Sequence, residues 1–264
     1  MELDGILNDV SAYLEWELDE GRRTVSVSPD VVAELGDAAG KVETEMPEPK
    51  PKPQAPPTPA VSSSTPRTPA KPGDSLEAVA AEIAECTACE LHEARTNTVP
   101  GQGCMHPDIL FIGEAPGADE DAQGIPFVGR SGQLLTKMIE AMGYSRDTVF
   151  IANINKCRPP GNRAPSPAEM QVCIPYLKRQ ISLLEPKLIV ALGATAINGL
   201  VDLPKGMGIT KVRGSWLEFE GIPLMPTFHP AYMLRNPNMK RPVWEDLKNV
   251  LRRLGKPIPE MKKA

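Results

Sequence analysis

The chain has 264 residues, of which 41% are hydrophobic, and a formal net charge of −5. Its length fits one large domain or two small ones. It contains no run of about eighteen apolar residues, which excludes a membrane span, and its acidic N-terminus argues against a secretory signal. We therefore expect a cytoplasmic monomer that does not bind membranes, with cysteines kept as thiols or metal ligands.

Residues 1–46 form an acidic N-terminal segment. In this segment Leu3, Ile6, Leu7, Val10 and Leu14 recur at helical spacing. A short amphipathic helix could therefore dock a repair or replication protein, although a poorly ordered tail fits the same sequence.

Residues 47–73 form a linker with ten prolines. Such a segment buries too little apolar surface to offset its ordering entropy, so we expect it to be disordered. The charges divide at the same place. Residues 1–73 carry 13 acidic and 7 basic side chains, net −6, and residues 74–264 carry 21 and 22, net +1. The folded domain is therefore expected over residues 74–264.

Within that domain, short apolar runs that predict buried strands alternate with helical patterns. The runs cover residues 109–112, 149–152, 188–192 and 223–228. One helix is predicted over residues 131–142, and another begins at a capping box that starts with Ser166. This alternation predicts an α/β fold with three layers, α/β/α, around a central, mainly parallel four-stranded sheet. Ligands bind such sheets at the carboxyl ends of the strands, where Gly113, Asn153 and His229 fall.

Four of the five cysteines form two pairs. Two residues separate Cys86 from Cys89, and fifteen separate Cys157 from Cys173. A close pair joined to a distant pair by the fold matches tetrahedral zinc or one iron–sulfur cluster, because both take four thiolates. Buried, inert thiols are the alternative. Cys104 has no partner by spacing.

Four features together resemble the family 4 uracil-DNA glycosylases, the iron–sulfur type. Three are segments, at residues 113–129, 153–163 and 228–235, that are similar to the family's active-site motifs in order and spacing, and the fourth is the cysteine pattern. The resemblance implies a uracil-DNA glycosylase-like fold and uracil-containing DNA as the partner. It also implies a 4Fe-4S cluster held by Cys86, Cys89, Cys157 and Cys173.

The resemblance further implies a uracil pocket. Its first motif supplies the pocket residues Gly113, Ala115, Pro116 and Gly117. Phe127 would stack on the base, Asn162 would read the uracil edge, and His229 would donate a hydrogen bond to the departing base. The alternatives are core packing for Phe127, a turn asparagine for Asn162 and a structural turn histidine for His229.

The resemblance places Glu114 in the same pocket as a catalytic residue, to position water or to reject a C5 methyl group. The best-known uracil glycosylases have a water-activating aspartate at the position where this chain has Ala115. The general base therefore stays open between Glu114, Glu120 and Asp121. Solvated loop charge is the alternative for the last two.

An enzyme that acts on a base inside a duplex must extrude that base, and an apolar side chain can fill the vacated stack. Met233 or Leu234 is expected to be this wedge, with a buried helix start as the alternative. Phosphate contacts are expected from Arg158, Arg163, Lys211, Arg213 and Arg235.

The resemblance thus predicts a monofunctional uracil-DNA glycosylase that flips uracil out of DNA, hydrolyses its N-glycosidic bond and starts base excision repair. The main alternative is a non-catalytic uracil-DNA-binding module with the same fold. A variant that traps DNA covalently through a histidine in a basic insertion fits less well, because the segment between Cys157 and Cys173 is short and has no histidine. A small-molecule hydrolase on the same fold is the weakest alternative.

Overall fold

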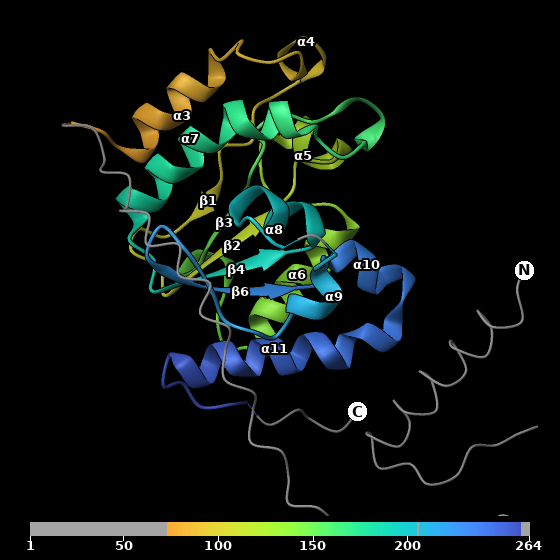
Figure 1. Ribbon diagram of the computed structural model, residues 1–264. Helices are drawn as coiled ribbons and strands as arrows, with labels where there is room; N and C mark the ends of the chain where they lie inside the picture. Colours follow the sequence, from red (N-terminus) through yellow and green to blue (C-terminus); the bar gives the residue numbers. More distant parts are fainter. Residues whose placement is uncertain (1–72, 205, 260–264) are drawn as a thin grey trace, which may run out of the picture. The chain divides into compact units, whose positions relative to one another are not determined.

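The structure is a computed structural model that describes residues 73–204 and 206–259 (Figure 1). The N-terminal helix and, apart from Gly73, the linker expected over residues 47–73 lie outside the described residues and stay predictions. In the described part of the chain, no helix is both long enough and apolar enough to cross a membrane.

A six-stranded mixed sheet forms the centre of the described domain, in the order β1-β3-β2-β4-β6-β5. The four inner strands are β3 (Phe150–Asn153), β2 (Ile109–Gly113), β4 (Leu188–Leu192) and β6 (Ile222–Thr227). They are parallel and correspond to the four predicted runs, which confirms the mainly parallel sheet. The edge strands β1 (Gln102–Gly103) and β5 (Leu217–Phe219) are antiparallel, so the predicted count of four was too low. They are too short to show a periodicity in the sequence.

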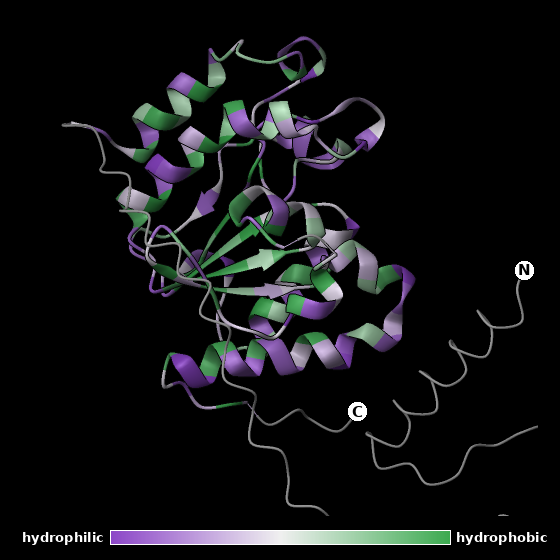
Figure 2. Ribbon diagram, viewed as in Figure 1, coloured by the Kyte–Doolittle hydropathy of each residue, from purple (hydrophilic) through white to green (hydrophobic). Residues whose placement is uncertain are grey.

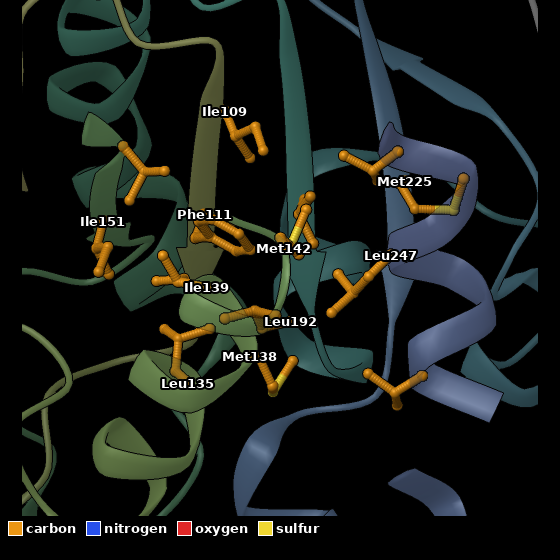
Figure 3. Packing of buried hydrophobic residues seen from close by; sticks show 14 of the residues in the cluster. Ile109, Phe111, Leu135, Met138, Ile139, Met142, Ile151, Leu192, Met225 and Leu247 are labelled. Atoms are coloured by element: carbon orange, nitrogen blue, oxygen red, sulfur yellow. The ribbon is translucent and has the colours of Figure 1, made fainter. Parts of the chain in front are cut away.

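Side chains alternate between the two faces of the sheet, and each face has its own core. From β2, Ile109 and Phe111 pack with residues of α6 (Arg130–Ala141) and α11 (Lys240–Arg253) (Figure 3). Leu110 and Ile112 point the other way and pack with α7 (Pro167–Leu184) and α8 (Ala194–Leu200). Figure 2 shows the hydrophobic strands between these helices. Because both faces of the strands are apolar, both need a helical cover, and the predicted three layers are confirmed.

Local sequence sets where the helices begin. The Ser166 hydroxyl accepts from the Glu169 N–H at 3.2 Å, and the Glu169 carboxylate accepts from the Ser166 N–H at 2.7 Å. The predicted capping box at the start of α7 is therefore confirmed. The other helices are α3 (Leu76–Ala84), α4 (Leu91–Ala94), α5 (Ala118–Gln123), α9 (Ile209–Val212) and α10 (Pro230–Arg235), with 3₁₀ turns η1 (Arg146–Thr148), η2 (Pro160–Asn162) and η3 (Pro237–Met239).

Two features of this architecture matter for the site. Parallel strands end at the same edge of a sheet, and Gly113 at the end of β2 pairs directly with Asn153 at the end of β3. On one helical layer, α3 is held to α7 by Arg179, which forms ion pairs with Asp74 at 2.8 Å and with Glu82 at 2.5 Å. The segment that follows α3 carries the first cysteine pair and α7 carries Cys173, so these ion pairs join the two parts of the chain that hold these cysteines.

Candidate active site

A cavity of about 520 Å³ opens at the carboxyl ends of the parallel strands. We call it the base cavity. It is lined by Glu114, Ala115, Pro116, Gly117, Glu120, Phe127, Ser131, Asn153, Pro159, Asn162, Arg163, His229, Ala231, Tyr232 and Arg235. The structure therefore brings together every pocket residue that the sequence predicted, except Gly113. Ser131, Asn153 and Tyr232 line the cavity without having been assigned a role from the sequence.

Gly113 and Phe127 are fitted to each other. A Cβ atom at Gly113 would clash with the Phe127 ring and with the Asn153 side-chain oxygen, so the glycine lets both side chains reach the cavity. Phe127 has a positive φ of 53°, which a bulky residue rarely adopts. Arg146 holds this backbone by donating to the Pro126 carbonyl at 2.6 Å and to the Phe127 carbonyl at 3.0 Å. The result is an aromatic ring fixed on one wall of the cavity.

Two asparagines line the base cavity in different states. Asn153 is 1% exposed, and its Oδ1 has no hydrogen-bond partner among the described residues. Such an oxygen costs about 1–3 kcal/mol when it stays unpaired, so it is suited to meet a ligand. Asn162 is exposed on η2, and its Oδ1 accepts from Arg158 Nε at 2.7 Å. The geometry therefore adds Asn153 to Asn162 as a candidate for the residue that contacts a ligand in this cavity. The sequence placed Asn153 at a strand end but gave the role to the later asparagine of the motif.

His229 is the N-cap of α10. Its Nδ1 accepts a hydrogen bond from the Ala231 N–H at 3.1 Å, so the neutral ring carries its proton on Nε2. Burial lowers the pKa of His229 to about 4, and the charge of Arg235 contributes to the lowering while Glu120 opposes it. The ring centroid lies 5.7 Å from that of Phe127. A neutral N–H donor is therefore available in the cavity near neutral pH.

The three candidate bases differ in their surroundings. The Glu120 carboxylate accepts three backbone N–H bonds at 2.9 to 3.1 Å from the loops that flank the cavity, so it holds these loops together. Asp121 accepts from the Thr96 N–H at 2.9 Å and does not line the cavity. Glu114 lines the cavity, and no described residue donates a hydrogen bond to its carboxylate. Of the three, Glu114 is the carboxylate that is free to bind water.

Helix α10 places two neighbouring apolar residues in different surroundings. Leu234 is 40% exposed, beside Arg235 at the cavity. Met233 is 1% exposed and packs in the core with residues of α6, so the prediction that it contacts DNA is wrong and the buried-helix alternative applies to it. Successive residues on a helix point about 100° apart, which lets one face the core and the other face solvent.

The remaining basic residues are partly occupied by ion pairs. The Arg213 guanidinium binds the buried Asp246 at 2.8 Å, and it does not line the base cavity, so the structure does not support the predicted phosphate contact. Arg163 lines the cavity and also binds both oxygens of Glu169, at 2.6 and 2.8 Å. Lys211 is exposed on α9 and does not line the base cavity.

The four paired cysteines surround a second, smaller cavity, which we call the cysteine cavity. Cys86 and Cys89 lie between α3 and α4, Cys157 follows β3, and Cys173 lies on α7. Within residues 73–204 and 206–259, no group of three or more His, Cys, Asp or Glu side chains is arranged around a single metal ion. Cys104 does not line this cavity.

Hydrogen-bond donors point at these sulfurs. Arg95 Nη1 donates to Cys157 Sγ at 3.3 Å and to the Cys86 carbonyl at 2.7 Å. The Lys156 backbone N–H donates to Cys173 Sγ at 3.3 Å. Donors of this kind stabilise a thiolate relative to a thiol. The cysteine cavity therefore fits a group that four thiolates bind.

Comparison with known proteins identifies similar sequences. The sequence model described as the uracil DNA glycosylase superfamily matches residues 100–248. A type-4 uracil-DNA glycosylase from Thermotoga maritima is 47% identical over 175 residues, which cover 65% of this chain and 91% of the relative. One from Archaeoglobus fulgidus is 40% identical over 195 residues, 71% of this chain and 98% of the relative. A type-5 uracil-DNA glycosylase from Pyrobaculum aerophilum is 29% identical over 170 residues, 59% and 74%.

Proposed function

Because this chain belongs to the type-4 uracil-DNA glycosylases, within the uracil DNA glycosylase superfamily, we propose that its base cavity receives a uracil flipped out of DNA. The chain is a uracil-DNA glycosylase, a monofunctional hydrolase of DNA repair that acts on uracil-containing DNA. One observation supports the proposal that the base cavity is its active site. An aromatic ring, an unpaired buried amide oxygen and a neutral imidazole meet in a single cavity.

Recognition of the base falls to Phe127 and Asn153. The Phe127 ring offers a face for stacking, which contributes about 1–3 kcal/mol per base. The Asn153 Oδ1 accepts from uracil N3–H, and its amide N–H donates to uracil O4. Cytosine presents the opposite donor and acceptor pattern at these positions, so it would leave the buried amide unpaired and be rejected.

Hydrolysis breaks the bond between C1′ of deoxyribose and N1 of uracil, and the bonding electron pair leaves with the base. Water adds its hydroxyl to C1′, and its proton ends on the departing uracil or in solvent. The enzyme must stabilise the uracil anion that forms. His229 donates its Nε2–H towards uracil O2, where negative charge develops, and a donor fixed in a dry site acts strongly on such charge.

Glu114 is the residue to which we assign the attacking water. Its carboxylate lines the base cavity with no described donor bound to it. Ala115 beside it has no group that could take this role. Glu120 serves the reaction indirectly, because its three backbone hydrogen bonds hold the loops that carry Glu114 and Phe127.

On the DNA side, we assign the wedge to Leu234 and a phosphate contact to Arg235. Leu234 is exposed next to the cavity mouth, and an apolar side chain there can replace the extruded base in the stack. Arg158 and Arg163 lie on the η2 side of the same cavity and add positive charge for the backbone.

We propose that Cys86, Cys89, Cys157 and Cys173 hold a 4Fe-4S cluster, because all four line the cysteine cavity. When bound, the cluster would crosslink the segment between α3 and α4 to the end of β3 and to α7. Its role is structural, because hydrolysis of an N-glycosidic bond transfers no electrons overall.

Uracil release tests the proposed site and activity together. The full iron-loaded chain is mixed in excess with a duplex that holds one deoxyuridine opposite dG, and free uracil and abasic DNA are quantified. The expected result is one uracil for each abasic site, with no release of thymine from the duplex that carries thymidine instead. Tight binding without release would support the non-catalytic module, and DNA that stays covalently attached would support the trapping variant.

A further inference from the structure

Lys156 connects the cysteine cavity to the base cavity. Its side chain is 1% exposed, and its Nζ donates to the Asn153 carbonyl and to Gln180 Oε1, both at 2.8 Å. Its backbone N–H donates to Cys173 Sγ at 3.3 Å, and the next residue is Cys157. One residue therefore touches both the proposed cluster ligands and the asparagine that faces the base.

The charge of Lys156 needs a partner. A buried ammonium is costly unless negative charge compensates it. Both acceptors of its Nζ are neutral, and no ion pair among the described residues includes it. Arg95, which also lines the cysteine cavity, likewise donates to carbonyls and to a sulfur. Four thiolates would outweigh the positive charge of an iron–sulfur core, so a loaded cavity would supply the missing negative charge.

The other end of the link is the turn after β3. The Ile154 N–H donates to the Gly113 carbonyl at 3.0 Å, and the Asn155 N–H donates to the Glu114 carbonyl at 3.1 Å. The Lys156 ammonium donates to the Asn153 carbonyl. The turn is therefore held both by the chain that follows β2 and by Lys156. The direction of the Asn153 side chain follows from this backbone. A shift of about 1 Å in a group that touches the substrate can cost about 100-fold in rate.

We propose that Lys156 is a positioning residue whose Nζ fixes the Asn153 carbonyl, so that the Asn153 amide faces the base, and whose charge would be compensated by the loaded cysteine cavity. This inference rests on the proposed function of the base cavity. It makes the cysteine cavity part of base recognition as well as part of the fold, through one side chain.

Lys156→Met tests the link, because methionine fills a similar volume without charge or donor. The iron-loaded full chain is used throughout. Single-turnover uracil release is measured for wild type, Lys156→Met, Asn153→Ala and the double variant, together with iron content and the reduction potential of the cluster. Lys187→Met is the matched control, because it removes the same charge from an exposed lysine that pairs with Asp108, and Lys187 lines neither cavity.

The expected result for Lys156→Met is wild-type iron content and a rate of uracil release about 10- to 100-fold lower. Losses of this size are typical when a residue that hydrogen-bonds to a metal ligand and orients it is replaced. Because Lys156 acts through Asn153, the double variant should be no slower than Asn153→Ala. The potential should become more negative, because a positive charge beside the cluster is lost. The Lys187→Met control should match wild type in rate and potential.

Lys156→Gln is the second variant and keeps a donor for the Asn153 carbonyl without the charge. It should recover part of the rate that Lys156→Met loses but none of the shift in potential. Wild-type rates in the two iron-loaded Lys156 variants would overturn the inference, and so would losses that multiply with that of Asn153→Ala. Failure of wild type to release uracil would instead contradict the proposed function.

Discussion

Replacing Asn153 and Asn162 by alanine, one at a time, tests which of the two asparagines contacts the base and which only borders the cavity. Asn153→Ala removes two hydrogen bonds to uracil from a residue that is 1% exposed and has an unpaired Oδ1. At about 1–1.5 kcal/mol for each bond, the loss is about 2–3 kcal/mol. Since about 1.4 kcal/mol corresponds to a tenfold change in rate, uracil release should slow about 30- to 150-fold.

Asn162→Ala is the matched control, because it makes the same chemical change on the exposed rim. It removes a hydrogen bond with Arg158 at the surface, and surface changes are usually worth within about 0.5 kcal/mol. The expected loss is about twofold. Asn153→Asp should also raise cytosine release relative to uracil release, because a protonated carboxyl can donate to cytosine N3 and accept from its amino group.

The assay is single-turnover release from labelled duplexes that carry uracil or cytosine at the same position, with iron content measured for each variant. A slower release by Asn162→Ala than by Asn153→Ala, with wild-type iron content in both variants, would refute the assignment of the base-reading role to Asn153. That result would return the base-reading role to Asn162, as the sequence predicted.

Three further predictions follow from the same geometry. Arg146→Met should slow uracil release about tenfold in the wild-type background but not in the Phe127→Ala background, because Arg146 acts by holding the Phe127 carbonyl; equal losses in both backgrounds would contradict this. His229 has a pKa of about 4, below the unfolded value of about 6.5, so its neutral form stabilises the fold fully above about pH 6.5 and progressively less as pH falls towards 4. Denaturant unfolding from pH 4 to 8 should therefore show a smaller acid loss for His229→Gln, and an unchanged loss would count against the buried neutral ring. Cys173→Ser should lower iron content and the melting temperature, whereas Cys104→Ser should leave both unchanged; the reverse would reassign the ligand.

The sequence predicts the inner sheet well because each inner strand is a continuous apolar run. It misses the edge strands, since they have only two and three residues. Leu234 and Met233 show another limit, because adjacent apolar residues at a helix start do not reveal which one faces the core. Lys156 shows a third, because a lysine in a motif is normally exposed and its burial depends on how α7 packs over β3.

The sequence alone contains a signal that marks Asn153 as a candidate for binding the base. It is the polar residue that ends the apolar β3 run, at the edge where ligands bind parallel sheets. The sequence does not show that its Oδ1 is unpaired or that Asn162 is bound to Arg158. Whether each asparagine side chain finds a hydrogen-bond partner depends on how the surrounding side chains pack in three dimensions. The structure shows this packing, and the sequence alone does not.

The central claim is that uracil binds in the base cavity between Phe127, Asn153 and His229. A crystal structure of the iron-loaded chain with free uracil tests it most directly. We predict density for the base stacked on the Phe127 ring, with N3 and O4 within hydrogen-bond distance of the Asn153 amide and O2 within reach of His229 Nε2. Uracil bound at another place, or with its edge paired to Asn162, would contradict the account.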